Sequence, residues 1–185
     1  MSNFDEAYKI GIINEGGYNH ISGDRGGRTY CGVAENDWPE SLVWKMLGPW
    51  IESNGEPRYN EKFTNNDIPG IEDAVKDFYT ENFWNKMHGG GIASKSVAIF
   101  FYDWFINSMT VATKHLQQVL GITADGVFGS GTLQSVNAAG EGLLIKLHAS
   151  RDAFYASHVQ AVPGDAKFLS GWNARSDGLY NKLIA

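Results

Sequence analysis

The chain has 185 residues, of which 43% are hydrophobic and 13% aromatic, and its formal net charge is −6. This length fits one domain, or one domain with a subordinate lobe, and the apolar content is sufficient for a folded core. The acidic balance argues against nucleic acid as a partner, since that role needs clustered Lys and Arg. A lone cysteine, Cys31, excludes an internal disulfide and a Cys-rich zinc site.

The first predicted helix begins at Asn3 and ends at Gly16-Gly17, because Phe4, Tyr8 and Ile12 share one helical face and paired glycines are typical of a helix C-cap. The following residues, 18–34, are rich in glycine and polar groups, with an extended stretch at 28–33. This pattern predicts a small β-hairpin.

A short helix is predicted over residues 38–50, and the polar residues 51–69 are typical of a loop. From Ile71 the pattern is helical almost to the end of the chain, with Ser94 as an N-cap. These later helices are separated by glycine-containing stops at residues 89–91, 121 and 125–129. The expected fold class is mainly α, with one small β-hairpin.

Glu15 is the strongest candidate for chemistry. It lies at the end of the first predicted helix, where the negative field of the helix, together with burial against Tyr18, disfavours the charged form and raises the pKa. A carboxyl group that stays protonated near neutral pH can serve as the general acid in glycosidic-bond cleavage. The simpler interpretation is a surface glutamate near a helix end.

Asp24 and Thr29 lie in and after the glycine-containing turn that follows. An ionised Asp24 could activate water or stabilise an oxocarbenium-like transition state, and the Thr29 hydroxyl could hold a water molecule. The simpler interpretations are an aspartate bonded to its own turn and an ordinary strand threonine.

Other polar residues carry weaker signals. Asp103 and Asn107 are one helical turn apart, so they share a face that lines a sugar subsite or else packs at a helix interface. The Asp125–Gly129 turn lacks the further acidic ligands of a calcium loop, and the five histidines show no metal-ligand spacing. We therefore expect no metal and no cofactor. Cys31 has no histidine in register and is expected to be a small buried hydrophobe.

Two blocks of the sequence resemble one enzyme family. Glu15-Gly-Gly-Tyr18, Asp24, Gly26-Gly27, Thr29 and Gly32-Val33 resemble the opening of the N-acetylmuramidases of glycoside hydrolase family 108. The second block resembles the C-terminal part of the family, often called a predicted peptidoglycan-binding domain. It comprises Tyr79–Trp84, Asp103, Asn107-Ser108, Leu116-Gln117, Leu120-Gly121, Asp125–Gly129, Thr132-Leu133, Lys167-Phe168 and Gly171–Arg175. Arg28 departs from the family, which usually has Glu before the threonine.

The resemblance implies a lysozyme-like domain over residues 1–185, with a catalytic helix and hairpin lobe at 1–70 and a helical lobe resembling the peptidoglycan-binding region at 71–185. It implies a muramidase that cleaves between N-acetylmuramic acid and N-acetylglucosamine. Glu15 would be the acid, Asp24 the second carboxylate and Thr29 the water-positioning partner. The candidate substrate-binding residues are Tyr18, Asp103 and Asn107.

Two other functions stay open: a lytic transglycosylase, which also needs an essential glutamate, and a peptidoglycan-binding module without catalysis. The expected partner is the glycan strand, bound by a monomer. No apolar run is long enough for a membrane span and the start of the chain lacks the features of a secretory signal, so no membrane insertion is expected. A wall-degrading enzyme made in the cytoplasm would then need release, as a phage endolysin is released through a holin pore.

Overall fold

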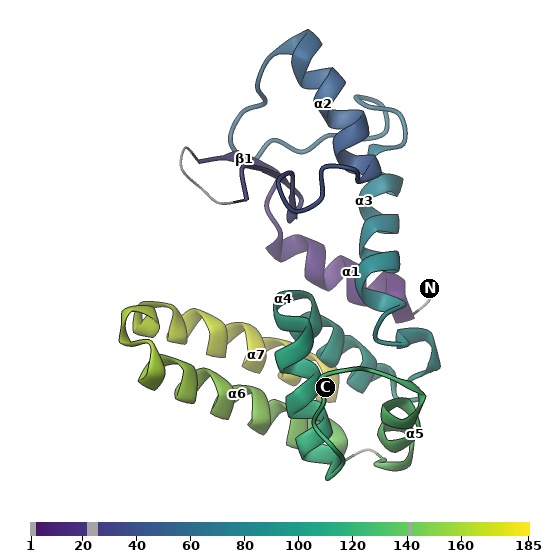
Figure 1. Cartoon of the computed structure of the whole chain (residues 1–185), viewed down its shortest axis with the longest axis vertical. Coiled ribbons are helices and arrows are strands. Elements are labelled where there is room, and N and C mark those ends of the chain that lie inside the picture. Colours follow the sequence, from purple (N-terminus) through teal and green to yellow (C-terminus); the bar gives the residue numbers. More distant parts are fainter. Residues whose placement is uncertain (1–2, 22–25, 141) are drawn as a thin grey trace. The chain divides into compact units, whose positions relative to one another are not determined.

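Helices dominate the computed structural model of this protein, which describes residues 3–21, 26–140 and 142–185 (Figure 1). Within these residues the α-helices are α1 (Asn3–Asn14), α2 (Leu42–Asn54), α3 (Ile71–Tyr79), α4 (Lys95–Leu120), α5 (Ser130–Ala138), α6 (Leu143–Ala161) and α7 (Leu169–Ile184). The strands are β1 (Tyr18–His20), β2 (Arg28–Tyr30) and β3 (Val33–Ala34). Shorter helical turns cover Thr80–Trp84, Gly89–Gly91 and Pro163–Phe168. The expected mainly α fold class is confirmed.

The chain divides into two units, which we call the sheet unit (Tyr8–Asn82) and the helical unit (Met1–Ala7 with Phe83–Ala185). The division after residue 70 that the sequence suggests stays a prediction. Helix α3 packs against other elements of the sheet unit. Phe78 of α3, for example, lies edge-on to Trp38, with ring centroids 5.0 Å apart.

The β element is a three-stranded antiparallel sheet in the order β1-β2-β3. Strands β1 and β2 form the expected hairpin, in which Asn19 pairs with Thr29. The third strand is an addition to the prediction: Thr29 also pairs with Ala34. The turn from β2 to β3 is tight, because Cys31 and Gly32 both have positive φ angles, of 47° and 78°.

Helix α2 packs against α3, contacts β3 of the sheet and begins later than predicted. The helix starts after Ser41, whose hydroxyl accepts a hydrogen bond from the Trp44 N–H at 3.4 Å. A capping side chain of this kind satisfies one of the free N–H groups of the first turn, which explains the late start. Trp44 is buried, and its indole N–H donates to the carbonyl oxygen of Val33 at 3.1 Å.

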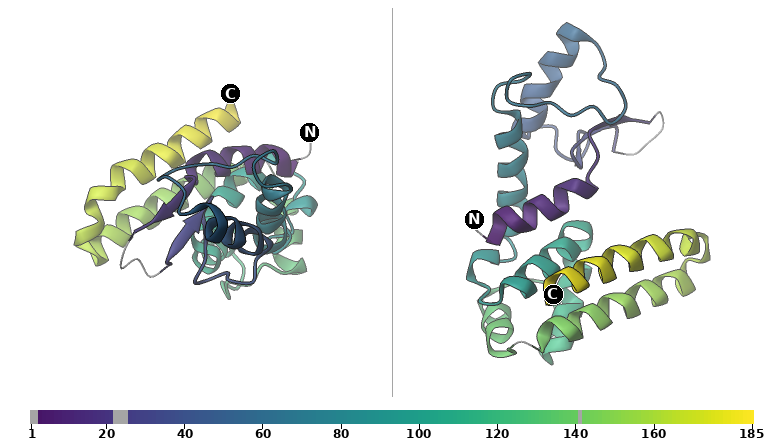
Figure 2. Two further views of the ribbon diagram at one scale, coloured as in Figure 1. Left: turned by 90° about the horizontal axis from the view of Figure 1, so that it is seen from above. Right: turned by 180° about the vertical axis from the view of Figure 1, so that it is seen from behind.

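In the helical unit, α6 and α7 run side by side and α4 packs against both (Figure 2). The predicted N-cap Ser94 is confirmed, since its hydroxyl accepts from the Val97 N–H at 3.4 Å. Helix α4 is broken at Ser108, whose backbone angles (φ −161°, ψ 59°) are not helical. Among the helices that the structure describes, none has both the length and the apolar character needed to cross a bilayer.

Candidate active site

A cavity of about 200 Å³ lies beside the sheet, within the sheet unit. Its lining residues are Glu15, Gly16, Gly17, Tyr18, Asn19, Thr29, Gly32, Tyr59 and Asn60. Glu15 directly follows α1, and Thr29 lies on the central strand β2. Two of the three residues predicted to be catalytic therefore line one cavity.

The backbone after Glu15 is held by the segment at residues 59–61. The Gly17 N–H donates to the Asn60 side-chain carbonyl at 2.7 Å, and the Tyr18 N–H donates to the Glu61 carbonyl at 2.8 Å. A Cβ at Gly17 would lie 2.5 Å from the Asn60 carbonyl oxygen. Only glycine allows so close an approach of two backbones, and this approach fixes the path of the chain out of α1.

The Glu15 carboxyl group lies against Gly32. A Cβ at Gly32 would be 2.8 Å from Glu15 Oε2 and would overlap the Tyr79 hydroxyl. That hydroxyl donates to the Cys31 carbonyl at 2.9 Å, and Tyr79 is buried. Glu15 itself is half-buried, and the last turn of α1 contains no basic residue. The carboxyl is therefore held at a helix end whose field is not offset by a cation in that turn.

Thr29 is half-buried at the centre of the sheet, between Asn19 on β1 and Ala34 on β3. Its neighbour Arg28, which replaces the usual Glu of the family, forms a two-pronged ion pair with Glu35 at 2.5 and 2.6 Å. The hydrogen bond to Glu35 is the main cause that raises the pKa of Arg28. Arg28 and Glu35 thus form an ion pair next to Thr29, which links β2 to the residue that follows β3.

Tyr18 forms part of the cavity wall. The side chain is only 2% exposed, and its hydroxyl donates to the Glu56 carboxylate. Burial, followed by this hydrogen bond, raises the pKa of the Tyr18 phenol, so it stays neutral. Asp24, the predicted second carboxylate, lies outside the described residues, and its role stays a prediction.

Asp103 and Asn107 lie in the helical unit, at a second cavity of about 350 Å³. Asp103 is 1% exposed and accepts hydrogen bonds from Arg151 at 2.9 Å and from Arg175 at 2.7 Å. The Asn107 amide donates to the Asp103 carbonyl at 2.8 Å and lines the cavity. Asp103 is therefore an ion-pair residue behind this cavity, and neither residue lines the Glu15 cavity.

Cys31 is buried behind the Glu15 site. Burial raises the pKa of its thiol, against the opposing effects of Lys62 and of the Tyr30 hydroxyl. A thiol with a raised pKa supplies little thiolate at neutral pH, so it is a poor nucleophile. This environment agrees with the prediction of a small buried hydrophobe.

Sequence analysis did not predict that Gly32 and Tyr79 help to position Glu15. Gly32 stood in the family motif, and a glycine after Cys31 could have indicated a close approach of another group. Tyr79 appeared only at the start of the second block of the family resemblance. Its hydroxyl reaches the β2–β3 turn through a contact 48 residues apart in sequence, which no local pattern indicates.

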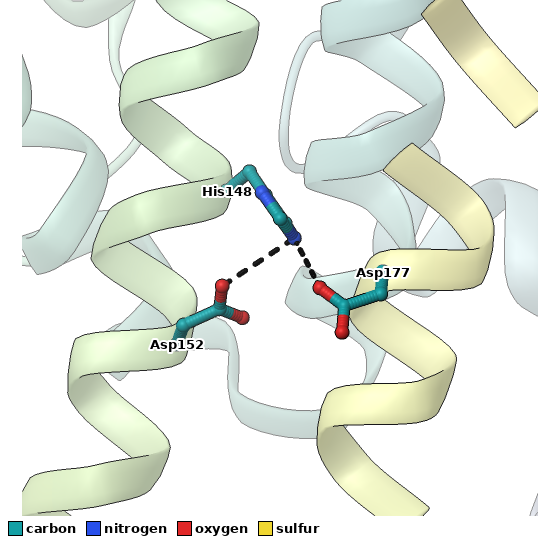
Figure 3. A group of neighbouring side chains, drawn as sticks. All are labelled: His148, Asp152 and Asp177. Atoms are coloured by element: carbon teal, nitrogen blue, oxygen red, sulfur yellow. Dashed lines mark hydrogen bonds and ion pairs between the residues drawn. The ribbon is translucent and has the colours of Figure 1, made fainter. Parts of the chain in front are cut away.

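One group of side chains in the helical unit could hold a metal ion: His148 and Asp152 on α6 with Asp177 on α7 (Figure 3). His148 Nε2 lies 2.8 Å from Asp177 Oδ1 and 3.4 Å from Asp152 Oδ2. The spacing of histidines in the sequence did not reveal this group because Asp177 comes from another helix. Tyr180 stacks on the imidazole at 4.2 Å, and Ser176 donates to Asp152 at 3.1 Å. With these contacts, the three side chains form a polar link between α6 and α7.

The comparisons with known proteins identify the family. Residues 9–108, more than half of the chain, match the family model described as glycosyl hydrolase 108. The chain belongs to the glycosyl hydrolase 108 family. Residues 111–177 of this family member match a second model, described as a predicted peptidoglycan domain. The structure of Brucella abortus SagA is similar, with a TM-score of 0.66 and 26% identity over 98% of this chain and 93% of that chain. A comparison with curated protein sequences gives no match.

The protein is therefore a glycoside hydrolase, and the two matches together support peptidoglycan as its substrate. The glycosyl hydrolase match contains Glu15, Thr29 and the cavity that they line. It ends at Ser108, where α4 is broken, and the peptidoglycan match begins at Val111. The break in α4 thus coincides with the junction of the two matches.

Proposed function

We propose that this protein is an N-acetylmuramidase, which hydrolyses the bond between N-acetylmuramic acid and N-acetylglucosamine with Glu15 as general acid. The observation that carries the proposal is the placement of the Glu15 carboxyl: half-buried against Gly32, directly after α1, in one cavity with the Thr29 side of the sheet. Membership of the glycosyl hydrolase 108 family supplies the reaction class.

The chemistry follows from this placement. A general acid must carry a proton when the substrate binds, and the negative end of α1 together with partial burial favours the protonated carboxyl. Glu15 gives its proton to the departing sugar oxygen as the glycosidic bond breaks. Asp24 stabilises the positive charge that develops on the sugar ring or activates the attacking water. Thr29 orients that water through its hydroxyl.

The deciding experiment is digestion of purified peptidoglycan by the wild type and by Glu15→Gln, with the products identified by mass spectrometry. Glutamine keeps the size of the side chain but cannot give up a proton, so the rate should fall by about 10²- to 10⁴-fold. The matched control is Glu52→Gln, the same change at an exposed position on α2, which should digest at the wild-type rate. Wild-type lysis by Glu15→Gln would remove Glu15 from the mechanism.

The products of the same digest separate the alternatives. Hydrolysis leaves muramic acid at new reducing ends, whereas a lytic transglycosylase leaves 1,6-anhydro ends and a binding module leaves no new ends. Asp24→Asn tests the second carboxylate in this assay, and full activity of that variant would make Asp24 a turn residue. A monomeric state and release through a holin-type pore stay predictions of the sequence.

A further inference from the structure

The cavity of about 350 Å³ in the helical unit has the size and lining of a ligand pocket. It is lined by residues of α4, α6 and α7: Trp104, Asn107, Ser108, Arg151, Phe154, Tyr155, His158, Trp172 and Arg175. Four of these side chains are aromatic and two are guanidinium groups. The glycosidase chemistry at Glu15 uses none of them.

Two hydrogen-bond donors on the wall of this cavity have no acceptor among the described residues: Arg151 Nη1 and Trp104 Nε1. Both side chains are 1% exposed. A buried donor without an acceptor is destabilising, and more so when it is charged, so native proteins rarely leave one unpaired. The guanidinium carbon of Arg151 lies 5.9 Å from the centre of the Trp104 ring, so the two side chains with unpaired donors are neighbours.

The charge of Arg151 is only partly compensated. Its Nη2 donates to Asp103 at 2.9 Å and its Nε donates to the Tyr155 hydroxyl at 2.7 Å. Asp103 is the carboxylate partner of Arg151 in the described structure, and Arg175 binds the same carboxylate at 2.7 Å. His158, which also lines the cavity, is paired with Asp165 at 2.8 Å. The unpaired Nη1 therefore leaves positive charge buried in the wall of the cavity, with less than 1 Å² of accessible surface.

We propose that this cavity binds a carboxylate group of a peptidoglycan fragment. A small shift of the side chains that cover them lets Arg151 Nη1 and Trp104 Nε1 donate to its two oxygens. The rings of Phe154, Tyr155 and Trp172 pack against the atoms that carry the carboxylate. Asp103 is a positioning residue, which holds both arginines from behind. This proposal rests on the proposed function, because it takes the substrate, peptidoglycan, as the source of the ligand.

A carboxylate fits this pocket better than the neutral acetamido group of a sugar. An uncompensated guanidinium favours an anion, and hydrogen bonds between ionised groups are about twice as strong as those between neutral ones. The volume of about 350 Å³ also far exceeds the roughly 30 Å³ that one water molecule occupies. Peptidoglycan carries carboxylates in two places: on the lactyl group of muramic acid and on its peptide stems.

The test uses four small probes on the full chain, with isothermal titration calorimetry and the ¹H–¹⁵N signal of the Trp104 indole as readouts. N-acetylmuramic acid carries the lactyl carboxylate, and N-acetylglucosamine is its neutral counterpart. The tripeptide L-Ala-γ-D-Glu-meso-diaminopimelate carries the stem carboxylates, and its fully amidated form lacks them. We expect at least one carboxylate probe to bind about tenfold or more tightly than its counterpart without the carboxylate and to shift the Trp104 signal. The probe that does so identifies the source.

Trp104→Phe removes one donor and keeps an aromatic ring, so it tests the site without the loss of buried charge that Arg151→Ala would cause. This variant should bind the carboxylate probe about tenfold more weakly, whereas Trp38→Phe in the sheet unit should bind it as the wild type does. Equal binding of the probes with and without a carboxylate, no binding of either carboxylate probe, or unchanged binding by Trp104→Phe would overturn the proposal. No probe contains a glycosidic bond that Glu15 could cleave, so these results are independent of the digestion assay.

Discussion

At the residue scale, the position of the proposed acid depends on a glycine. Gly32 has a φ of +78°, and the Glu15 carboxyl and the Tyr79 hydroxyl both lie where its side chain would be. The bare Cα thus serves two purposes: it permits the turn between β2 and β3, and it makes room for the carboxyl.

Gly32→Ala should therefore damage both stability and activity. An L-residue in the left-handed region costs about 1–2 kcal/mol, and the new methyl group would also displace Tyr79 and Glu15. We expect a loss of at least that size in the free energy of unfolding, measured in urea, and digestion of peptidoglycan at least tenfold slower. The control is Gly178→Ala inside α7, where nothing apart from the adjoining residues lies within 4 Å of the new Cβ and alanine should stabilise by about 0.5–1 kcal/mol. Wild-type digestion by Gly32→Ala would show that the carboxyl tolerates displacement.

Sequence analysis predicted some residues of this site and missed others. Glu15 and Thr29 were found because a helix stop and a strand have local signals, and the structure places both on one cavity. Tyr59 and Asn60 were assigned to a featureless loop. Their place at the cavity depends on backbone hydrogen bonds between Asn60 and the residues after Glu15, which are far away in sequence.

At the scale of elements, the turn between α4 and α5 is held by one buried side chain, Gln117. Its amide donates to Asp125 at 2.7 Å, to the Val127 carbonyl at 3.1 Å and to Thr132 at 3.2 Å, and its carbonyl accepts from the Gly126 N–H at 2.8 Å. The Val127 N–H, followed by Gln117, lowers the pKa of Asp125, so this turn keeps its carboxylate charged at lower pH than a free aspartate would. The predicted structural turn at 125–129 thus has a physical cause that its own residues do not reveal.

Gln117→Met should destabilise the protein, because methionine fills the space but makes none of these hydrogen bonds. Several polar groups of the turn then lose their partner at a buried position, and each such loss costs about 1–3 kcal/mol. We expect a loss of about 2–4 kcal/mol in the free energy of unfolding, measured in urea. Gln118→Met, the same substitution at the exposed neighbouring position, should change stability by less than about 0.5 kcal/mol. Equal effects at the two positions would contradict the role assigned to Gln117.

Helix ends were predictable where a cap was present and uncertain elsewhere. Ser94 begins α4 as expected because a serine before an apolar run is a local signal. Helix α2 was expected from residue 38, but the Ser41 cap delays it to Leu42. Strand β3 has only two residues, and its pairing with β2 depends on the turn at Cys31 and Gly32, so no alternating pattern could indicate it.

At the scale of the whole molecule, the start of the chain does not belong to the unit that follows it. Residues up to Ala7 group with Phe83–Ala185, and the sheet unit begins at Tyr8 within the same helix α1. Phe4 lies 5.4 Å from the Trp84 ring and 6.1 Å from the Tyr102 ring, and Glu6 pairs with Lys95 at 2.5 Å. The sequence showed Phe4 and Tyr8 on one helical face, but the partners of that face lie about eighty or more residues away and could not be inferred.

Phe4→Ala should therefore destabilise the helical unit, although it changes a residue near the start of the chain. Phe4 is 8% exposed, and removal of a buried phenylalanine side chain costs about 3–5 kcal/mol through lost burial and the cavity left behind. The matched control is Phe168→Ala, at a position that is 48% exposed, where the loss should stay below about 1 kcal/mol. Urea unfolding followed by tryptophan fluorescence measures both, since Trp84 lies beside Phe4 and Trp172 beside Phe168. If the two variants lose equal stability, the N-terminal turn contributes no more to the helical unit than an exposed aromatic residue does.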